Sequence, residues 1–162
     1  MHFAVFILRC IKPMATSQFS PRLFTVDEAN DLLPALRPLM KRVFDHLDFL
    51  RKKSATVIRE ERLSPNSPDL MERLQENDSI ARIIQEVKGL VEEVNSCGCL
   101  CKGVEQGLVD FPCMLGGEIV FLCWRYGEES VAHWHRIEDG FGGRRPLLDA
   151  EEDEGSGNVS YH

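Results

Sequence analysis

The chain has 162 residues, of which 43% are hydrophobic and 28% are charged, a composition typical of one soluble globular domain. Its formal net charge of -7 argues against nucleic-acid binding, because neutralising phosphates requires a dense basic face. An apolar run from Phe3 to Leu8 is far too short to span a membrane, so no membrane partner is expected.

Residues 1–22 are expected to lie outside the folded domain. The first 26 residues contain no acidic residue, and they carry Arg9, Lys12 and Arg22 among several hydroxyl residues. This composition resembles an organelle transit segment, and the alternative is an upstream extension with Met14 as a second possible start. The expected compartment is cytoplasmic, or a plastid or mitochondrion if the segment is a transit peptide.

A long helix is predicted over about residues 26–62. Thr25-Val26-Asp27-Glu28 has the sequence of a capping box, and apolar residues follow at helical spacing. Pro34 and Pro38 lie inside this helix, so a bend is expected near its start, because each proline removes a backbone hydrogen bond.

A second helix is predicted over about residues 68–96. Ser67 can cap its N-terminus, and Pro68 suits its first position. The short connection makes the two helices an antiparallel hairpin, whose polar end would project like a coiled coil. Their apolar stripes are broad at the other end, so the sheet is expected to pack there.

After Gly98, a candidate helix C-cap, the apolar spacing changes to period two. A sheet is predicted over about 99–136, as an antiparallel meander in which Gly116-Gly117 forms a tight turn. Its strands are expected over residues 99–104, 107–115, 118–125 and 131–136.

The strand over 118–125 is apolar on both faces. One face can pack on the helices, and the other needs a cover, either the segment 140–148 or a second copy of the protein. The fold class is therefore α+β over residues 23–148, a long antiparallel helical hairpin packed on a small antiparallel β-meander. Residues 149–162, rich in acidic side chains, are predicted to form a disordered tail.

Polar side chains lie among the apolar residues of these strands. If Gly116-Gly117 is a two-residue turn, Asp110 faces Cys123, and Arg125 lies diagonal to Asp110 on the same face. The structural interpretation of this pattern is an ion pair between Asp110 and Arg125 that fixes the sheet.

His133 and His135 share one face by period two. A five-residue connection, 126–130, would put both on the face of Asp110 and Cys123, and these four residues are ligand types that suit zinc. A four-residue connection would turn both histidines to the other face and dissolve the cluster.

The six cysteines are expected to be reduced thiols. Cys97, Cys99 and Cys101 alternate along one run, where a bridge between residues two apart has poor geometry. They are interpreted as small hydrophobic residues on the inner face of a strand. The segment from Gly140 to Pro146 could wrap an anion with backbone amides and guanidinium groups.

The chain resembles the uncharacterised domain of unknown function family 2203 over about residues 23–148. The resemblance rests on a series of motifs in the same order, which are Phe24-Thr25-Val26-Asp27-Glu28-Ala29-Asn30, Leu32-Leu33-Pro34, Leu36-Arg37-Pro38-Leu39, Gly107 to Pro112, Leu122-Cys123-Trp124-Arg125, Trp134-His135, Gly140-Phe141, Gly143-Arg144 and Pro146-Leu147. It implies no established activity. The matching positions point to one candidate polar cluster, formed by Asp110, Cys123, Trp124, Arg125, His135, Phe141 and Arg144.

The chain departs from the family pattern at three positions. His133 stands where the family has a tyrosine, and Cys99 and Cys101 stand where aliphatic residues are usual. These departures argue against a metal site that depends on those three residues.

Three functions are compatible with these residues. The favoured one is a non-catalytic interaction or scaffold module that self-associates as a homodimer, with no cofactor and with any other protein partner unidentified. The alternative is an anionic-ligand-binding protein or small enzyme, in which Arg125 and Arg144 hold the anion and Asp110 or His135 acts as acid or base. The third is a metal-binding protein.

The first two functions predict different geometries. A scaffold predicts Asp110 paired with Arg125 and no cleft, whereas a ligand site predicts an open concavity where Arg144 and His135 converge.

Overall fold

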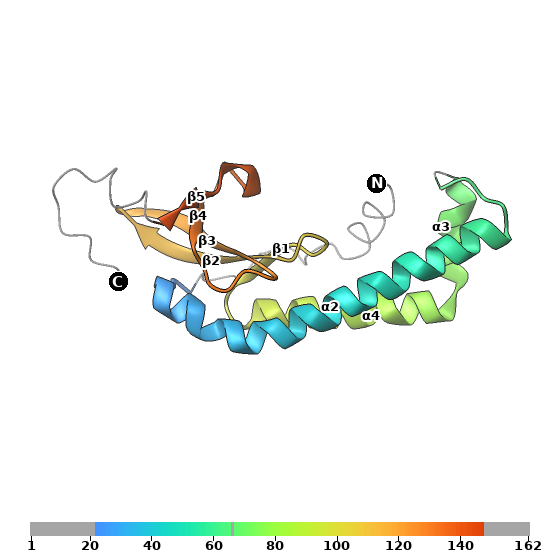
Figure 1. Ribbon diagram of the computed structural model, residues 1–162, viewed down its shortest axis with the longest axis horizontal. Coiled ribbons are helices and arrows are strands. Elements are labelled where there is room, and N and C mark those ends of the chain that lie inside the picture. Colours follow the sequence, from blue (N-terminus) through green and yellow to red (C-terminus); the bar gives the residue numbers. More distant parts are fainter. Residues whose placement is uncertain (1–21, 66, 148–162) are drawn as a thin grey trace.

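The computed structural model describes residues 22–65 and 67–147, and the expectations for residues 1–21 and 149–162 lie outside this part of the chain. Its elements follow in the order α2 (Val26–Glu60), α3 (Pro68–Glu76), α4 (Asp78–Ser96), β1 (Leu100–Gly103), β2 (Leu108–Leu115), β3 (Glu118–Arg125), β4 (His133–Arg136), the short 3-10 helix η1 (Phe141–Gly143) and β5 (Arg145–Pro146). Helices α2 and α4 lie side by side, and the sheet packs against one end of the pair (Figure 1). The predicted α+β class is confirmed.

The N-terminus of α2 is held by the expected capping box. The N–H of Glu28 donates to Oγ1 of Thr25 at 3.1 Å, and the N–H of Thr25 donates to Oε2 of Glu28 at 2.9 Å. The helix continues through Pro34 and Pro38. Its axis changes direction in its first part, coloured blue in Figure 1, as expected where two backbone donors are missing.

The single helix predicted over about 68–96 is in fact two helices, divided at Asn77. Asn77 has an extended backbone, and its Oδ1 accepts the N–H groups of Ser79 at 3.1 Å and Ile80 at 3.2 Å. It therefore ends α3 and caps α4. The apolar spacing hid this break, because Leu74 and Ile80 are buried in the same cluster on either side of it.

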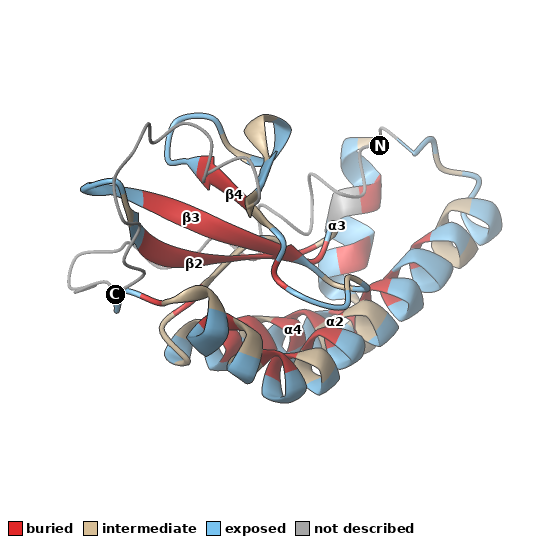
Figure 2. Ribbon diagram, turned by 60° about the vertical axis from the view of Figure 1, so that its left-hand side comes forward, coloured by how far each residue is buried: buried red, intermediate tan, exposed pale blue. Residues whose placement is uncertain are grey.

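Buried apolar residues form two clusters, drawn in red along the facing sides of the helices and through the sheet in Figure 2. One lies within the helix pair and includes Leu47 and Val87. The other lies between the first half of α2 and the sheet, where Leu36 meets residues such as Phe111 and Trp124. The sheet thus packs at the end where the apolar stripes are broad, as predicted.

The sheet is an antiparallel meander with strand order β1-β2-β3-β4-β5. Gly116 and Gly117 form the β2–β3 turn with φ values of 55° and 81°, a combination that favours glycine at both positions. Leu115 pairs with Glu118, so the predicted register is confirmed, and Asp110 lies opposite Cys123.

Both faces of β3 are buried from Val120 to Trp124, whereas Ile119 near its start is exposed. Leu122 and Trp124 pack towards the helices, whereas Phe121 and Cys123 point to the opposite face and are still only 8% and 1% exposed. After β4 the chain returns past this face through η1, and β5 then pairs with β4 (Figure 1). Of the two predicted covers, the segment that begins near Gly140 therefore supplies part of the cover within the chain.

Candidate functional site

The connection between β3 and β4 decides which face the histidines take. His133 lies opposite Cys123 and His135 lies opposite Phe121. This is the register predicted for a five-residue connection, and it places both histidines on the face that carries Asp110.

Helix α2 holds this connection in place. The carbonyl of Glu128 accepts from Nε1 of Trp124 at 3.0 Å and from Nη1 of Arg37 at 3.3 Å. The N–H of Val131 donates to Oδ1 of Asn30 at 2.8 Å. The course of this connection, residues 126–132, is thus held by contacts with a distant part of the sequence, and with it the face that the histidines take.

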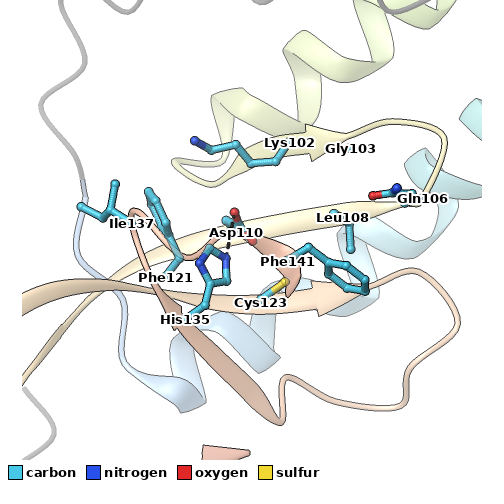
Figure 3. A pocket seen from close by; sticks show the side chains of 11 residues that line it. Lys102, Gly103, Gln106, Leu108, Asp110, Phe121, Cys123, His135, Ile137 and Phe141 are labelled. Atoms are coloured by element: carbon cyan, nitrogen blue, oxygen red, sulfur yellow. Dashed lines mark ion pairs between the residues drawn. The ribbon is translucent and has the colours of Figure 1, made fainter. Parts of the chain in front are cut away.

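Three side chains converge on this face (Figure 3). The Nε2 of His135 lies 3.4 Å from Oδ2 of Asp110, and these two atoms and the Sγ of Cys123 all lie within 4.8 Å of one another. Asp110, Cys123 and His135 are only 4%, 1% and 3% exposed. They come from the adjacent strands β2, β3 and β4, so the hydrogen bonds of the sheet fix the spacing of their backbones.

Hydrogen bonding at His135 leaves acceptor atoms facing one another. The Nδ1 of His135 lies 2.7 Å from the carbonyl oxygen of Arg136, and a carbonyl can only accept, so Nδ1 carries the proton. In the neutral ring, Nε2 then directs a lone pair at the carboxylate of Asp110. The buried Oδ1 of Asp110 accepts no hydrogen bond from any described residue. Buried acceptors in this arrangement require a proton or a cation between them.

A pocket of about 240 Å³ opens above the three side chains (Figure 3). Phe121 and Phe141 stand on opposite sides of it, and the exposed side chains of Lys102 and Gln106 contribute to its rim. The site therefore combines a buried polar floor with apolar walls.

The sequence profile of a family described as "Uncharacterized conserved protein (DUF2203)" matches residues 22–147. The chain belongs to the DUF2203 family. The match covers every element named above and all the candidate site residues, but membership in DUF2203 assigns no activity. No curated protein and no solved structure matches the chain. Within the described part of the chain, none of the helices has the length and apolar character needed to cross a membrane.

The ion pair predicted between Asp110 and Arg125 is not formed in the described part of this DUF2203 chain. The predicted register does place Arg125 diagonal to Asp110, but Arg125 is exposed, and the carboxylate of Asp110 lies beside Nε2 of His135 instead. A guanidinium keeps its hydration in that exposed position, whereas burying it beside Asp110 would carry a large desolvation cost.

Arg144 braces the strands beside the site. Its Nη2 lies 2.9 Å from both carboxylate oxygens of Glu128, 3.3 Å from the carbonyl oxygen of Cys123 and 3.1 Å from Nδ1 of His133. Its guanidinium also lies 5.0 Å from the ring centroid of Phe141, a wall of the pocket. Arg144 is thus committed to Glu128, and the predicted role of Arg144 in holding an anion does not match this geometry.

The thiol of Cys123 has a raised pKa. The main cause is burial, followed by the negative charge of Asp110 and a hydrogen bond between the thiol and Asp110, while the positive charge of Arg144 acts in the opposite direction. The uncharged thiol is therefore favoured until a cation displaces its proton.

The other described cysteines are free thiols that do not join this group. Cys99 is fully buried in the core between α2 and the sheet, as predicted for an inward-facing residue, but it precedes β1, and Cys97 caps α4, so of the three only Cys101 lies in a strand. Burial is the main cause that raises the pKa values of Cys99 and Cys101 to about 12. Neither is a reactive thiol at neutral pH.

One predicted member of the polar cluster, Trp124, and one predicted metal candidate, His133, have other roles, and some residues of the pocket were missed. Trp124 is fully buried on the helix side of the sheet, and His133 contacts Arg144 rather than the three-residue group. The missed residues include Lys102, Gln106 and Phe121. The alternation of side chains along β1 predicts that Lys102 lies on the pocket side of the sheet, but a register shift between Cys101 and Gly103 disturbs this alternation.

Proposed function

We propose that this DUF2203 protein binds a transition-metal ion, with zinc the best fit, through Asp110, Cys123 and His135. The observation that carries the proposal is the convergence of three buried ligand-type side chains, one of which has an unpaired carboxylate oxygen. Carboxylate, thiolate and imidazole are the three ligand types that zinc takes in proteins. The same group of residues was the third of the functions compatible with the sequence, with His133 as a fourth member.

Distances support zinc. Zinc–ligand bonds of about 2.0–2.3 Å in a tetrahedral site place the ligand atoms roughly 3.3–3.6 Å apart. Oδ2 of Asp110 and Nε2 of His135 are already 3.4 Å apart, and the ligand atoms of all three residues lie within 4.8 Å of one another, so the thiol would move closer to complete the set.

The surroundings also support a metal. Nδ1 of His135 is oriented by the carbonyl of Arg136, which is the usual outer contact of a metal-ligating histidine. A carboxylate and a thiolate together balance the charge of a divalent ion. Arg125 and Arg144 do not line the pocket, so the anionic-ligand function based on those two residues has less support.

The metal content of the purified protein tests this proposal. Protein without a histidine tag, loaded with zinc and dialysed, is expected to retain stoichiometric zinc by inductively coupled plasma mass spectrometry. Cys123→Ala and His135→Ala are expected to lose it, because two remaining ligands hold zinc weakly. Cys113→Ala is the matched control, since Cys113 is also a buried strand cysteine but points to the helix side. Retention by Cys123→Ala, or no zinc in the wild type, contradicts the proposal.

Self-association as a homodimer is a second proposed role, supported by a row of exposed apolar side chains. Met114 pairs with Ile119 across the β2–β3 hairpin, and Ile137 continues the row beyond β4. They are 37%, 41% and 56% exposed, on the face that η1 covers only in part.

The oligomeric state tests this second role. Light scattering after size-exclusion chromatography is expected to give a dimer for the wild type and a monomer for Ile119→Glu, because a charge would then lie in the apolar contact. Leu23→Glu is the control, since Leu23 is 38% exposed and lies outside the row. A monomeric wild type would rule the role out.

A further inference from the structure

A metal ion held by Asp110, Cys123 and His135 would be accessible to a further ligand from the pocket. Asp110, Cys123 and His135 all line the pocket, so an ion held by them would lie at its floor with one side open. Sites with three protein ligands and one open position are the type at which small molecules bind zinc directly. What enters the pocket is then decided by its charge, its size and its walls.

Charge balance favours an anion, but only when the metal is present. The pocket lining contains one carboxylate, Asp110, and one fixed cation, Lys102. Without the metal, the carboxylate at the floor repels an anion. A divalent ion with the carboxylate and the thiolate makes the floor neutral, and Lys102 then leaves one positive charge to be balanced.

Lys102 is positioned to meet such a ligand. Its Nζ lies 5.0 Å from the ring centroid of Phe121, one of the two aromatic walls. Its side chain is exposed and extends over the pocket in Figure 3. The side-chain amide of Gln106 lies at the same rim and offers a further hydrogen-bond donor.

The walls and the volume limit the ligand. Phe121 and Phe141 face the pocket from opposite sides, so an apolar body can lie between them. The volume of about 240 Å³ is below the roughly 300–1,000 Å³ of pockets that hold drug-sized molecules. The single positive charge of Lys102 does not balance the two negative charges of a phosphate dianion, whereas it balances the one charge of a carboxylate.

We infer that the pocket takes a small organic monocarboxylate, whose carboxylate binds the metal and contacts Lys102 while its short apolar body lies between Phe121 and Phe141. This inference rests on the proposed metal site and adds the class of its ligand. Metal and ligand bind in that order, because the metal removes the repulsion from Asp110.

Calorimetric titration with benzoate tests this inference. Zinc-loaded wild type is expected to bind benzoate, and zinc-stripped protein is expected to show no binding. Benzamide has the same shape without the charge and is expected not to bind. Inorganic phosphate is the third probe, and tighter binding of phosphate than of benzoate would overturn the carboxylate class.

Two variants separate the contributions of charge and of the apolar wall. Lys102→Met is expected to keep its zinc and to bind benzoate about tenfold more weakly, through the loss of one charged contact. Phe141→Ala is expected to weaken benzoate binding and to leave acetate binding unchanged, because acetate has no ring to place against the wall. Lys52→Met, at an exposed position of α2, is the control for the charge change.

The outcomes distinguish this inference from the proposal on which it rests. Stoichiometric zinc without benzoate binding overturns the ligand class and leaves the metal site standing. Failure to bind zinc overturns both. Equal benzoate binding by zinc-loaded and zinc-stripped protein overturns the required order of binding. Unchanged benzoate binding by Lys102→Met overturns the proposed role of Lys102.

Discussion

Zinc is expected to raise the midpoint of thermal unfolding of the wild-type protein by roughly 10 °C or more when the free ion is about 1,000-fold above its dissociation constant. A ligand that binds only the folded state stabilises it by about 4 kcal/mol at that ratio. The folded sheet preorganises Asp110, Cys123 and His135, whereas the unfolded chain holds them apart. Differential scanning fluorimetry with EDTA and with added zinc measures the shift.

Cys123→Ala is expected to remove most of this thermal shift, and Cys113→Ala is expected to retain it. Both substitutions truncate a buried strand cysteine, so any difference in zinc response reports the face on which the thiol lies. Calcium serves as an ion that prefers oxygen ligands and should give little shift. Equal zinc responses of the two variants would contradict the placement of the metal at Cys123.

The largest effect on stability outside the apolar core is expected for Arg144→Met, which should lower the free energy of unfolding by about 2–4 kcal/mol. The side chains of Arg144 and Glu128 are only 11% and 21% exposed, and Arg144 supplies the positive charge in this ion pair. Its removal leaves the carboxylate of Glu128 partly buried without a cation. Urea denaturation of the protein in reducing buffer measures the loss.

The double variant Glu128→Gln/Arg144→Met is expected to recover part of that loss, because the uncompensated charge is gone. Arg51→Met is the control: the ion pair of Arg51 with Asp48 is exposed, so its loss should cost less than about 1 kcal/mol. Additive effects of the two single substitutions would argue that Glu128 and Arg144 are not energetically coupled.

Local sequence signals predicted the scaffold of the site well. A capping box, a proline at a first helical position and a pair of glycines act through a few neighbouring residues, and each lies where it was predicted. The two glycines fix the β2–β3 register, and that register alone places Asp110 opposite Cys123.

The partner of Asp110 could not be predicted from register alone. Register places Arg125 diagonal to Asp110 on the adjacent strand β3, whereas His135 lies on the same face but on β4, two strands away. The choice between them depends on which side chain can be buried, and an imidazole loses less hydration on burial than a guanidinium does. The ion pair with Arg125 was therefore the wrong choice.

The helix break at Asn77 and the pocket residues near a turn were the other features not predicted from the sequence. Asn77 interrupts a pattern of apolar residues that remains regular on both sides, and the preference of asparagine for caps over helix interiors was the signal that this pattern hid. Lys102 and Gln106 reach the pocket from β1 and the turn after it, where a register shift disturbs the period of two.

The resemblance to the family, in contrast, pointed to the three residues that are now proposed as ligands. Asp110, Cys123 and His135 all stand at its matching positions, whereas the departures at His133, Cys99 and Cys101 lie outside the three-residue group. Those departures therefore do not argue against a metal at this site.

The three proposed ligands belong to three successive strands, which has a consequence for local opening of the sheet. An ion bound to all of them would cross-link β2, β3 and β4 through their side chains, in addition to the backbone ladder. Amide hydrogen exchange in these strands would then slow when the ion is bound, while the exchange rate in α3, which is remote from the site, would not change. Such a cross-link would let a pocket on a thin sheet hold its shape without a second layer of helices.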